Sequence, residues 1–180
     1  MAGSAQHFIS ILMDALPNIS SEKIISKGEY LLREGQVERN LYFIENGAVR
    51  LFHLHEFEEL TVRFGYEGSF INSLSSFIKS SPSEFYIEAI RKTSVKTISK
   101  ESLYQLINEN FENQQSYSAF LEVVITQQIE REIDLLTTSP SARLNRVLER
   151  SPNLFQQIPL KYIASYLRMT PETVSRIRNS

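Results

Sequence analysis

The chain has 180 residues, of which 42% are hydrophobic and 22% charged, proportions typical of a folded globular protein. No stretch of the sequence approaches the roughly 18 consecutive apolar residues of a membrane span. It contains no cysteine and three histidines, which excludes disulfides, thiolate metal sites and cysteine nucleophiles and leaves little for a metal enzyme. Residues 1–138 hold 12 Lys and Arg against 19 Asp and Glu, whereas residues 139–180 hold seven against two, so the basic end either meets a polyanion or docks on its own acidic body.

The first segment, residues 7–25, is predicted to be helical. Phe8, Leu12 and Leu16 recur at helical spacing, Pro17 breaks the pattern, and a second short turn is expected over residues 20–25. No basic segment precedes the apolar stretch, so it does not predict a signal peptide. We expect a cytoplasmic protein.

Residues 28–98 change to a period of two. Short apolar runs at residues 42–44, 49–52, 60–64, 85–87 and 95–98 are separated by glycine-containing turns, a pattern typical of an antiparallel sandwich or barrel. A short helix is expected within residues 69–79, with Phe70, Leu74, Phe77 and Ile78 on one face. The aromatic residues of this region are expected to form its core.

The chain then becomes helical. Leu103, Leu106, Ile107 and Phe111 predict a short amphipathic helix, and a longer helix is expected over residues 116–136. One apolar stripe follows the long helix: Tyr117, Leu121, Val124, Ile125, Ile129, Ile133 and Leu136. Such a stripe must cover an apolar surface, either on the chain's own barrel or, as we favour for a long helix between two domains, in a dimer seam.

Residues 137–141 carry the clearest linker signal, and a helix over 142–149, a break at 151–153 and two close helices follow. We therefore expect an α+β fold with three parts: an antiparallel β sandwich or barrel at 1–115, a long helix and linker at 116–138, and a helical domain at 139–180.

The last two helices have the chemistry of a helix-turn-helix. Small Ala164 allows a close crossing, Thr170 is a good N-cap, and Pro171 suits the first helical position. In such a motif the second helix reads the DNA major groove with its N-terminal residues, and Arg176 and Glu172 can pair with guanine and cytosine; alternatively they form only an exposed intrahelical pair. The predicted DNA-binding residues are Lys161, Thr170, Glu172, Thr173, Ser175, Arg176 and Arg178.

The chain resembles the Crp/Fnr superfamily of bacterial transcription regulators, in the variety common in Bacteroidetes. The matching stretches are residues 27–35, 41–50, 67–70, 82–85, 159–167 and, most specifically, 171–176. The resemblance implies a cyclic-nucleotide-binding-type β-roll of the double-stranded β-helix or jelly-roll type, a long dimerisation helix and a C-terminal winged helix-turn-helix. It also implies a homodimer that binds double-stranded DNA, with RNA polymerase as a further partner, and that Glu172 and Arg176 contact base edges.

The sequence departs from the cyclic-AMP-binding members at the ligand site. Those members carry Gly-Glu and Arg-Ser where this chain has Asn72-Ser73 and Ser83-Glu84. A cyclic phosphate needs a cationic fork, and a carboxylate beside a lost arginine repels it, so we expect no cofactor, no tight cyclic-nucleotide binding, and an effector pocket, if any, at Phe70, Asn72, Ser73, Ser83 and Glu84.

Two further departures concern the DNA-binding end. Arg168 stands where helix-turn-helix turns usually have glycine, so we expect the turn to be adjusted locally. The sequence ends two residues after Arg178, so no wing contacts are expected. The alternative function is a small-molecule sensor or scaffold with a degenerate C-terminal domain that does not bind DNA.

Other candidate sites are weaker. His53 and His55 share one side of a predicted strand but lack a third metal ligand of obvious spacing, and Glu56, Glu58 and Glu59 are expected in a solvated hairpin turn. No catalytic set or phosphate-binding loop is present, so we expect no enzyme activity.

Overall fold

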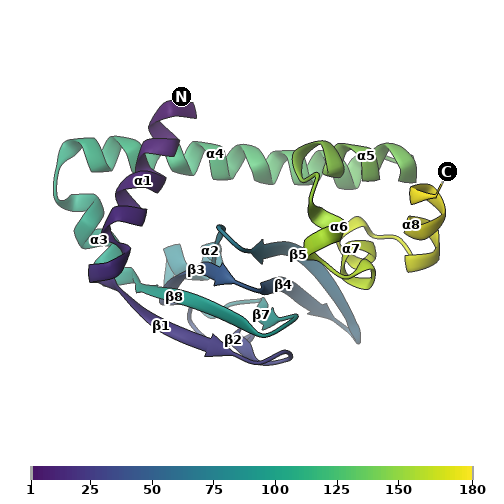
Figure 1. The fold of residues 1–180 in the computed structure, drawn as a ribbon, viewed down its shortest axis with the longest axis horizontal. Helices are drawn as coiled ribbons and strands as arrows, with labels where there is room; N and C mark the ends of the chain where they lie inside the picture. The colour runs from purple at the N-terminus through teal and green to yellow at the C-terminus, as the bar shows by residue number, and fades with distance from the viewer. Residues whose placement is uncertain (1, 180) are drawn as a thin grey trace.

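A computed structural model of the chain describes residues 2–179 and has an α+β fold (Figure 1). The strands are β1 Ser20–Ile25, β2 Tyr30–Leu32, β3 Asn40–Asn46, β4 Ala48–His55, β5 Glu58–Tyr66, β6 Phe70–Ile71, β7 Tyr86–Ala89 and β8 Thr93–Ser99. The helices are α1 Ala2–Ile19, α2 Leu74–Lys79, α3 Lys100–Asn108, α4 Phe111–Leu136, α5 Pro140–Arg150, α6 Leu154–Gln157, α7 Leu160–Leu167 and α8 Pro171–Arg178.

The strands form two four-stranded antiparallel sheets, in the orders β1-β8-β3-β6 and β2-β7-β4-β5. Alternate side chains of both sheets point inward and build one core that includes Ile44, Val49, Ile87 and Val95, all fully buried. The predicted antiparallel β-roll is therefore confirmed. Gly47 makes the turn from β3 to β4 with φ +99°, where a Cβ would lie 2.5 Å from Thr93 Oγ1, so only glycine fits this crossing between the sheets.

The N-terminal segment differs from the prediction. Helix α1 continues through Pro17 to Ile19, and residues 20–25 are strand β1 rather than a helical turn. All six of these residues pair in register with β8, and this pairing of an otherwise open sheet edge outweighs local helical preference. Helix α1 packs across α4, with Phe8 5.2 Å from Tyr117 between ring centroids.

The expected helix at residues 69–79 is also shorter than predicted. Phe70 and Ile71 instead form β6 against β3, where the Phe70 ring packs 5.0 Å from that of Phe43, and the helix starts at Leu74. Ile78 is half exposed rather than on the packed face. Cross-strand aromatic packing explains the difference.

The long helix α4 begins at Phe111, five residues earlier than predicted, because the Asn110 side chain accepts a hydrogen bond from the Asn113 N–H at 2.8 Å and caps it. At about 1.5 Å per residue, its 26 residues span about 39 Å. Its predicted apolar stripe divides in two. Tyr117, Leu121 and Val124 face a cavity against the β-roll, so this half of the stripe packs toward the chain's own barrel, as the first of the two interpretations has it.

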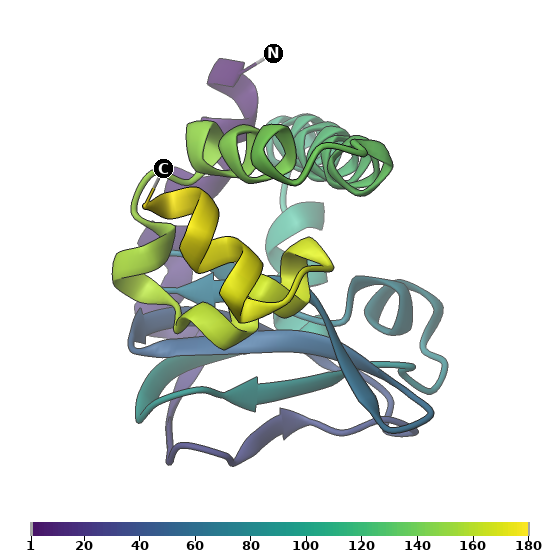
Figure 2. The same ribbon diagram turned by 90° about the vertical axis from the view of Figure 1, so that its right-hand side faces the viewer.

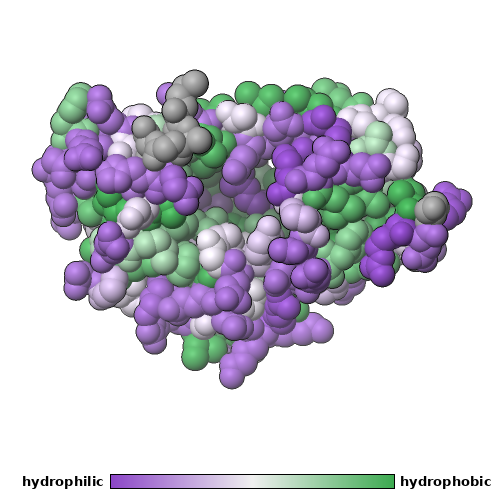
Figure 3. Space-filling view, turned by 45° about the horizontal axis from the view of Figure 1, so that its top comes forward, coloured by the Kyte–Doolittle hydropathy of each residue, from purple (hydrophilic) through white to green (hydrophobic). Residues whose placement is uncertain are grey.

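The other half of the stripe lies on the opposite side of α4 and is solvent-exposed. Ile125 is 59% exposed, Ile129 51%, Ile133 40% and Leu136 78%. Figure 3 shows hydrophobic surface along the upper edge of the molecule, where α4 runs. The side of α4 that faces the body carries buried polar residues as well as Tyr117, Leu121 and Val124: Asn113, Ser116, Arg131 and Asp134. We call the four exposed residues the α4 stripe.

Helices α5–α8 form a small unit around buried Leu144, Ile163, Leu167 and Val174. Short α6 was not predicted, because the Pro152-Asn153 break concealed its four residues. This unit packs against β4 and β5 of the roll, so the molecule is a roll with α4 along one side and the helical unit at one end (Figures 1 and 2). No helix in residues 2–179 is long and apolar enough to cross a membrane.

Candidate nucleic-acid interface and effector cavities

Helices α7 and α8 are joined by a tight turn. Arg168 has φ +55° and ψ +50°, so the left-handed turn persists with arginine in it and the expected local adjustment does not occur. The Arg168 N–H donates to the carbonyls of Ala164 and Ser165, which ends α7 in the way that glycine usually does. Thr170 then caps α8 by accepting from the Thr173 N–H at 3.2 Å, as predicted.

The turn brings the predicted DNA-binding residues to one end of the molecule. Lys161, Thr170, Glu172, Arg176 and Arg178 are exposed, and Thr173 and Ser175 are half-buried. Val174 is fully buried and Ile177 partly buried against α7, so the opposite side of α8 faces solvent at the end of the molecule seen in Figure 2. The arrangement presents a short basic helix outward.

Helix α7 is hydrogen-bonded to the roll. The Ser165 hydroxyl donates to the Glu59 carbonyl at 2.7 Å and accepts from the Thr61 N–H at 3.0 Å. Tyr166 packs on Phe64 with ring centroids 5.3 Å apart. Both Glu59 and Thr61 belong to β5, so the β4–β5 hairpin is the element through which the roll contacts α7.

The hairpin also carries a charge cluster around the buried Arg50. Arg50 donates to Glu88 at 2.7 Å and to Glu59 at 2.5 Å, and its guanidinium lies 4.4 Å from the centroid of the Tyr162 ring on α7. Glu59 is therefore ion-paired rather than part of a freely solvated turn, whereas Glu56 and Phe57 form the turn itself.

A second charge cluster joins α4 to α5. Asp134 is fully buried on α4; its carboxylate accepts from Arg146 Nε at 3.0 Å and from Arg150 Nη2. Glu130 accepts from Arg146 at 2.7 Å. These pairs fix how the helical unit follows the long helix.

The predicted effector-pocket residues separate into three places. Phe70 and Asn72 line a cavity of about 450 Å³ between the roll, α1 and α4, whose walls are mostly apolar. Ser73 and Ser83 are buried, and their hydroxyls bond each other at 2.8 Å. Glu84 is exposed and lies outside that cavity. The two serine hydroxyls are therefore hydrogen-bonded to each other. Neither position supplies the guanidinium group that a cyclic phosphate needs.

Glu38 lies beneath the same segment and is 1% exposed. Its carboxylate accepts from the Asn40 N–H at 3.0 Å, from the Tyr42 hydroxyl at 3.3 Å, and from the backbone at Ser73. Burial nevertheless raises its pKa from the ordinary 4.5 to about 7, these hydrogen bonds opposing the shift. Sequence reasoning missed this group, because nothing in its local pattern marks it as buried.

The Glu38 carboxyl makes stability depend on pH. Since the folded pKa lies above the unfolded one, this stabilising contribution is complete below pH 4.5 and is lost as the pH rises to about 7. The loss is roughly 3 kcal/mol. The free energy of unfolding, measured with urea at pH 5 and pH 8, should fall less between these two pH values in Glu38→Gln than in wild type. Exposed Glu67→Gln is the control; equal pH slopes in all three proteins would contradict the assignment.

His53 and His55 lie side by side on β4 as predicted, with ring centroids 6.3 Å apart. His53 Nδ1 bonds the Glu84 carbonyl at 2.9 Å. Residues 2–179 contain no cluster of three or more side chains suited to a metal ion.

A second cavity, of about 370 Å³, lies between β5, α4 and the helical unit. Arg63, Arg131 and Arg150 line it together with Gln127, Gln128 and Tyr166. The sequence analysis did not single out any of these residues. One residue could have indicated the cavity from the sequence. Arg131 falls on the side of α4 that packs against the body, where a buried charge is costly unless a partner or ligand binds it.

Residues 22–110 match the family model of the cyclic nucleotide-binding domain. Among solved structures, FixK2 from Bradyrhizobium japonicum is similar with a TM-score of 0.76 and 22% identity, over 89% of this chain and 83% of that one. A CooA variant from Carboxydothermus hydrogenoformans gives 0.72 and 17%, over 92% and 77%. A transcriptional regulator of the CRP family from Thermus thermophilus gives 0.63 and 19%, over 87% and 82%.

These likenesses show a shared fold that extends beyond the roll into the helical unit. No curated protein matches the chain.

Proposed function

We propose that the protein is a sequence-specific DNA-binding transcription regulator of the Crp/Fnr type that acts as a homodimer. The observation that carries the proposal is the α7–turn–α8 unit, which holds Glu172 and Arg176 on the exposed side of a capped helix while Val174 is fully buried. A solved structure of similar fold is a CRP-family transcriptional regulator. In the proposed division, residues 1–115 form the sensor, 116–138 the dimerisation segment and 139–180 the helix-turn-helix domain.

Charge supports this use of α8. The helical unit is net basic while the rest of the chain is net acidic, and Arg176 and Arg178 lie exposed in the last turn of α8. A phosphate backbone attracts such a surface without regard to sequence, and base-edge contacts from Glu172 and Arg176 add the sequence preference.

The α4 stripe supports the homodimer. Its members recur at spacings of four, four and three residues, as in a helix that packs along a partner helix, and they face away from the chain's own roll. Two copies joined along α4 would place their α8 helices to read half-sites about one DNA turn, roughly 34 Å, apart.

The roll is the proposed effector domain, and cyclic AMP is not its ligand. Ser73 and Ser83 bond each other where a cyclic phosphate would need an arginine. The mostly apolar cavity lined by Phe70 and Asn72 favours an effector other than a cyclic nucleotide at that place.

Arg176→Ala tests the function. We expect the variant to lose about 1–3 kcal/mol of binding free energy on its preferred DNA and to tolerate more bases at the contacted position. Fluorescence anisotropy at several salt concentrations measures both, since wild-type binding should weaken steeply as salt rises.

The matched control is Arg39→Ala, an exposed arginine on the roll that should bind like wild type. A footprint of Arg176→Ala identical to wild type would remove the assigned role. Absence of any salt-dependent DNA binding by wild type would favour the alternative, a sensor or scaffold without DNA binding.

A further inference from the structure

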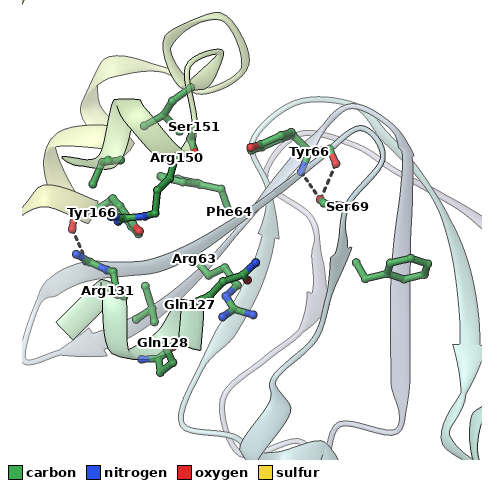
Figure 4. A pocket seen from close by; sticks show the side chains of 14 residues that line it. Arg63, Phe64, Tyr66, Ser69, Gln127, Gln128, Arg131, Arg150, Ser151 and Tyr166 are labelled. Atoms are coloured by element: carbon green, nitrogen blue, oxygen red, sulfur yellow. Dashed lines mark hydrogen bonds between the residues drawn. The ribbon is translucent and has the colours of Figure 1, made fainter. Parts of the chain in front are cut away.

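Three parts of the chain meet at the 370 Å³ cavity: β5, the body-facing side of α4, and the helical unit. Figure 4 shows Arg131, Arg150 and Tyr166 close together, with a hydrogen bond from Arg131 to Tyr166, and shows Arg63, Gln127 and Gln128 beside and below them. Aromatic side chains Phe64, Tyr66 and Tyr166 complete the wall. The cavity adjoins the one lined by Phe70 and Asn72, with which it shares Arg63, Ser69, Phe70 and Gln127, and it differs from that cavity in being bordered by three arginines.

Neither Arg63 nor Arg131 forms a salt bridge with a carboxylate among the described residues, although Asp134 attracts Arg131 from a longer distance. Arg131 is 6% exposed, and its Nη1 has no hydrogen-bond partner among the residues that the structure describes. Its Nη2 donates to the Tyr166 carbonyl, and the guanidinium stacks 3.8 Å from the Tyr166 ring centroid. The Arg63 guanidinium has no hydrogen bond or ion pair to any residue of the described range 2–179. A neutral carbonyl and a ring face do not balance a buried guanidinium.

The third arginine differs. Arg150 is ion-paired with Asp134 and Glu130, so it is already neutralised. No Asp or Glu is among the described residues that line the cavity. Burial lowers the pKa of both Arg63 and Arg131, and for Arg131 the attraction of Asp134 opposes this shift without cancelling it.

We propose that this cavity binds a small organic phosphate, held by Arg63 and by the unpartnered Nη1 edge of Arg131. Guanidinium groups donate two parallel hydrogen bonds to a phosphate in fixed geometry. The amides of Gln127 and Gln128 and the rings of Phe64 and Tyr166 surround the remainder of the ligand. The cavity volume lies within the range that drug-sized ligands occupy.

The binding site stands on geometry alone; its regulatory consequence rests on the proposed function. A ligand that bridges β5, α4 and the helical unit stabilises the arrangement in which Ser165 is bonded to β5. It thereby shifts the population between this docked arrangement and any other that DNA selects. The occupied cavity should therefore change DNA affinity.

Thermal unfolding of the full chain tests the site, with inorganic pyrophosphate as the probe and sodium chloride at equal ionic strength as the reference. Wild type should melt about 3 °C higher in millimolar pyrophosphate. Arg131→Met and Arg63→Met should each lose this rise, and the control Arg39→Met should retain it. Because Arg63 is less deeply buried than Arg131, Arg63→Met keeps the test valid if Arg131→Met folds poorly.

Several results would overturn the proposal. One is the absence of a rise in wild type, and another is a rise of equal size in Arg63→Met, since pyrophosphate would then bind elsewhere. A rise with citrate but not with pyrophosphate would contradict the phosphate class. DNA binding is measured separately on the same proteins, so a failure of the proposed function leaves the thermal result intact.

Discussion

Ile129→Glu is expected to convert the proposed homodimer into a monomer and to abolish tight DNA binding. Ile129 lies in the middle of the α4 stripe and is 51% exposed in the single chain. Burying an isoleucine completely contributes about 1.5–3 kcal/mol, and the two-fold axis of the dimer brings two copies of the residue into the interface. Because only the exposed half of Ile129 remains to be buried, the substitution should weaken the dimer by at least about 1.5 kcal/mol, or roughly 10-fold. Sedimentation equilibrium measures this directly.

The matched control for the dimer is Ile24→Glu, the same substitution at an exposed isoleucine of β1, which should remain dimeric. Because Ile129 is already exposed in one chain, its replacement should leave the fold of the protomer unchanged, as circular dichroism would show. Equal dimer affinity in wild type and Ile129→Glu would contradict the assignment of the α4 stripe.

Asp134→Asn is expected to destabilise the protein by about 3 kcal/mol. The side chain is fully buried and holds Arg146 and Arg150 of α5 against α4. Removing one partner of a buried ion pair leaves the other charges uncompensated, at a cost of about 3–5 kcal/mol. The arginines here are about one-third exposed, so water screens part of the loss and the lower end of this range applies.

Chemical denaturation measures the loss, and exposed Asp14→Asn is the control. Because the same pairs orient the helical unit on α4, Asp134→Asn should also reduce DNA affinity more than Asp14→Asn does. An unfolding free energy within about 0.5 kcal/mol of wild type would show that the cluster does not contribute to stability.

The antiparallel β domain could be predicted from the sequence because its strands alternate apolar and polar residues between glycine-containing turns. This pattern is local and does not depend on which strands pair. It failed at residues 20–25 and 70–71, where strand pairing is decided by partners distant in sequence. Spacing identified seven apolar residues of α4 but placed them on one stripe, and it left out others of the same helix such as Phe120 and Val123. Which of them face the roll depends on how α1 and β6 pack, and this is a tertiary property.

The predicted DNA-binding residues do lie at one end of the molecule, since α7, the turn and α8 are adjacent in sequence and local capping at Thr170 determines their geometry. The effector residues were less predictable. Ser73 and Ser83 are ten residues apart and bond each other, while Glu84 points elsewhere. Arg63 and Arg131 belong to different elements, and only the folded chain brings them to one cavity.

Selection of bound DNA from a random duplex pool by the full chain is the most direct test of whether a pair of α8 helices reads DNA. The selection should enrich an inverted repeat whose half-sites lie about one helical turn apart, roughly 34 Å. Recovery of no enriched sequence, or of a single half-site without its inverted copy, would contradict this prediction.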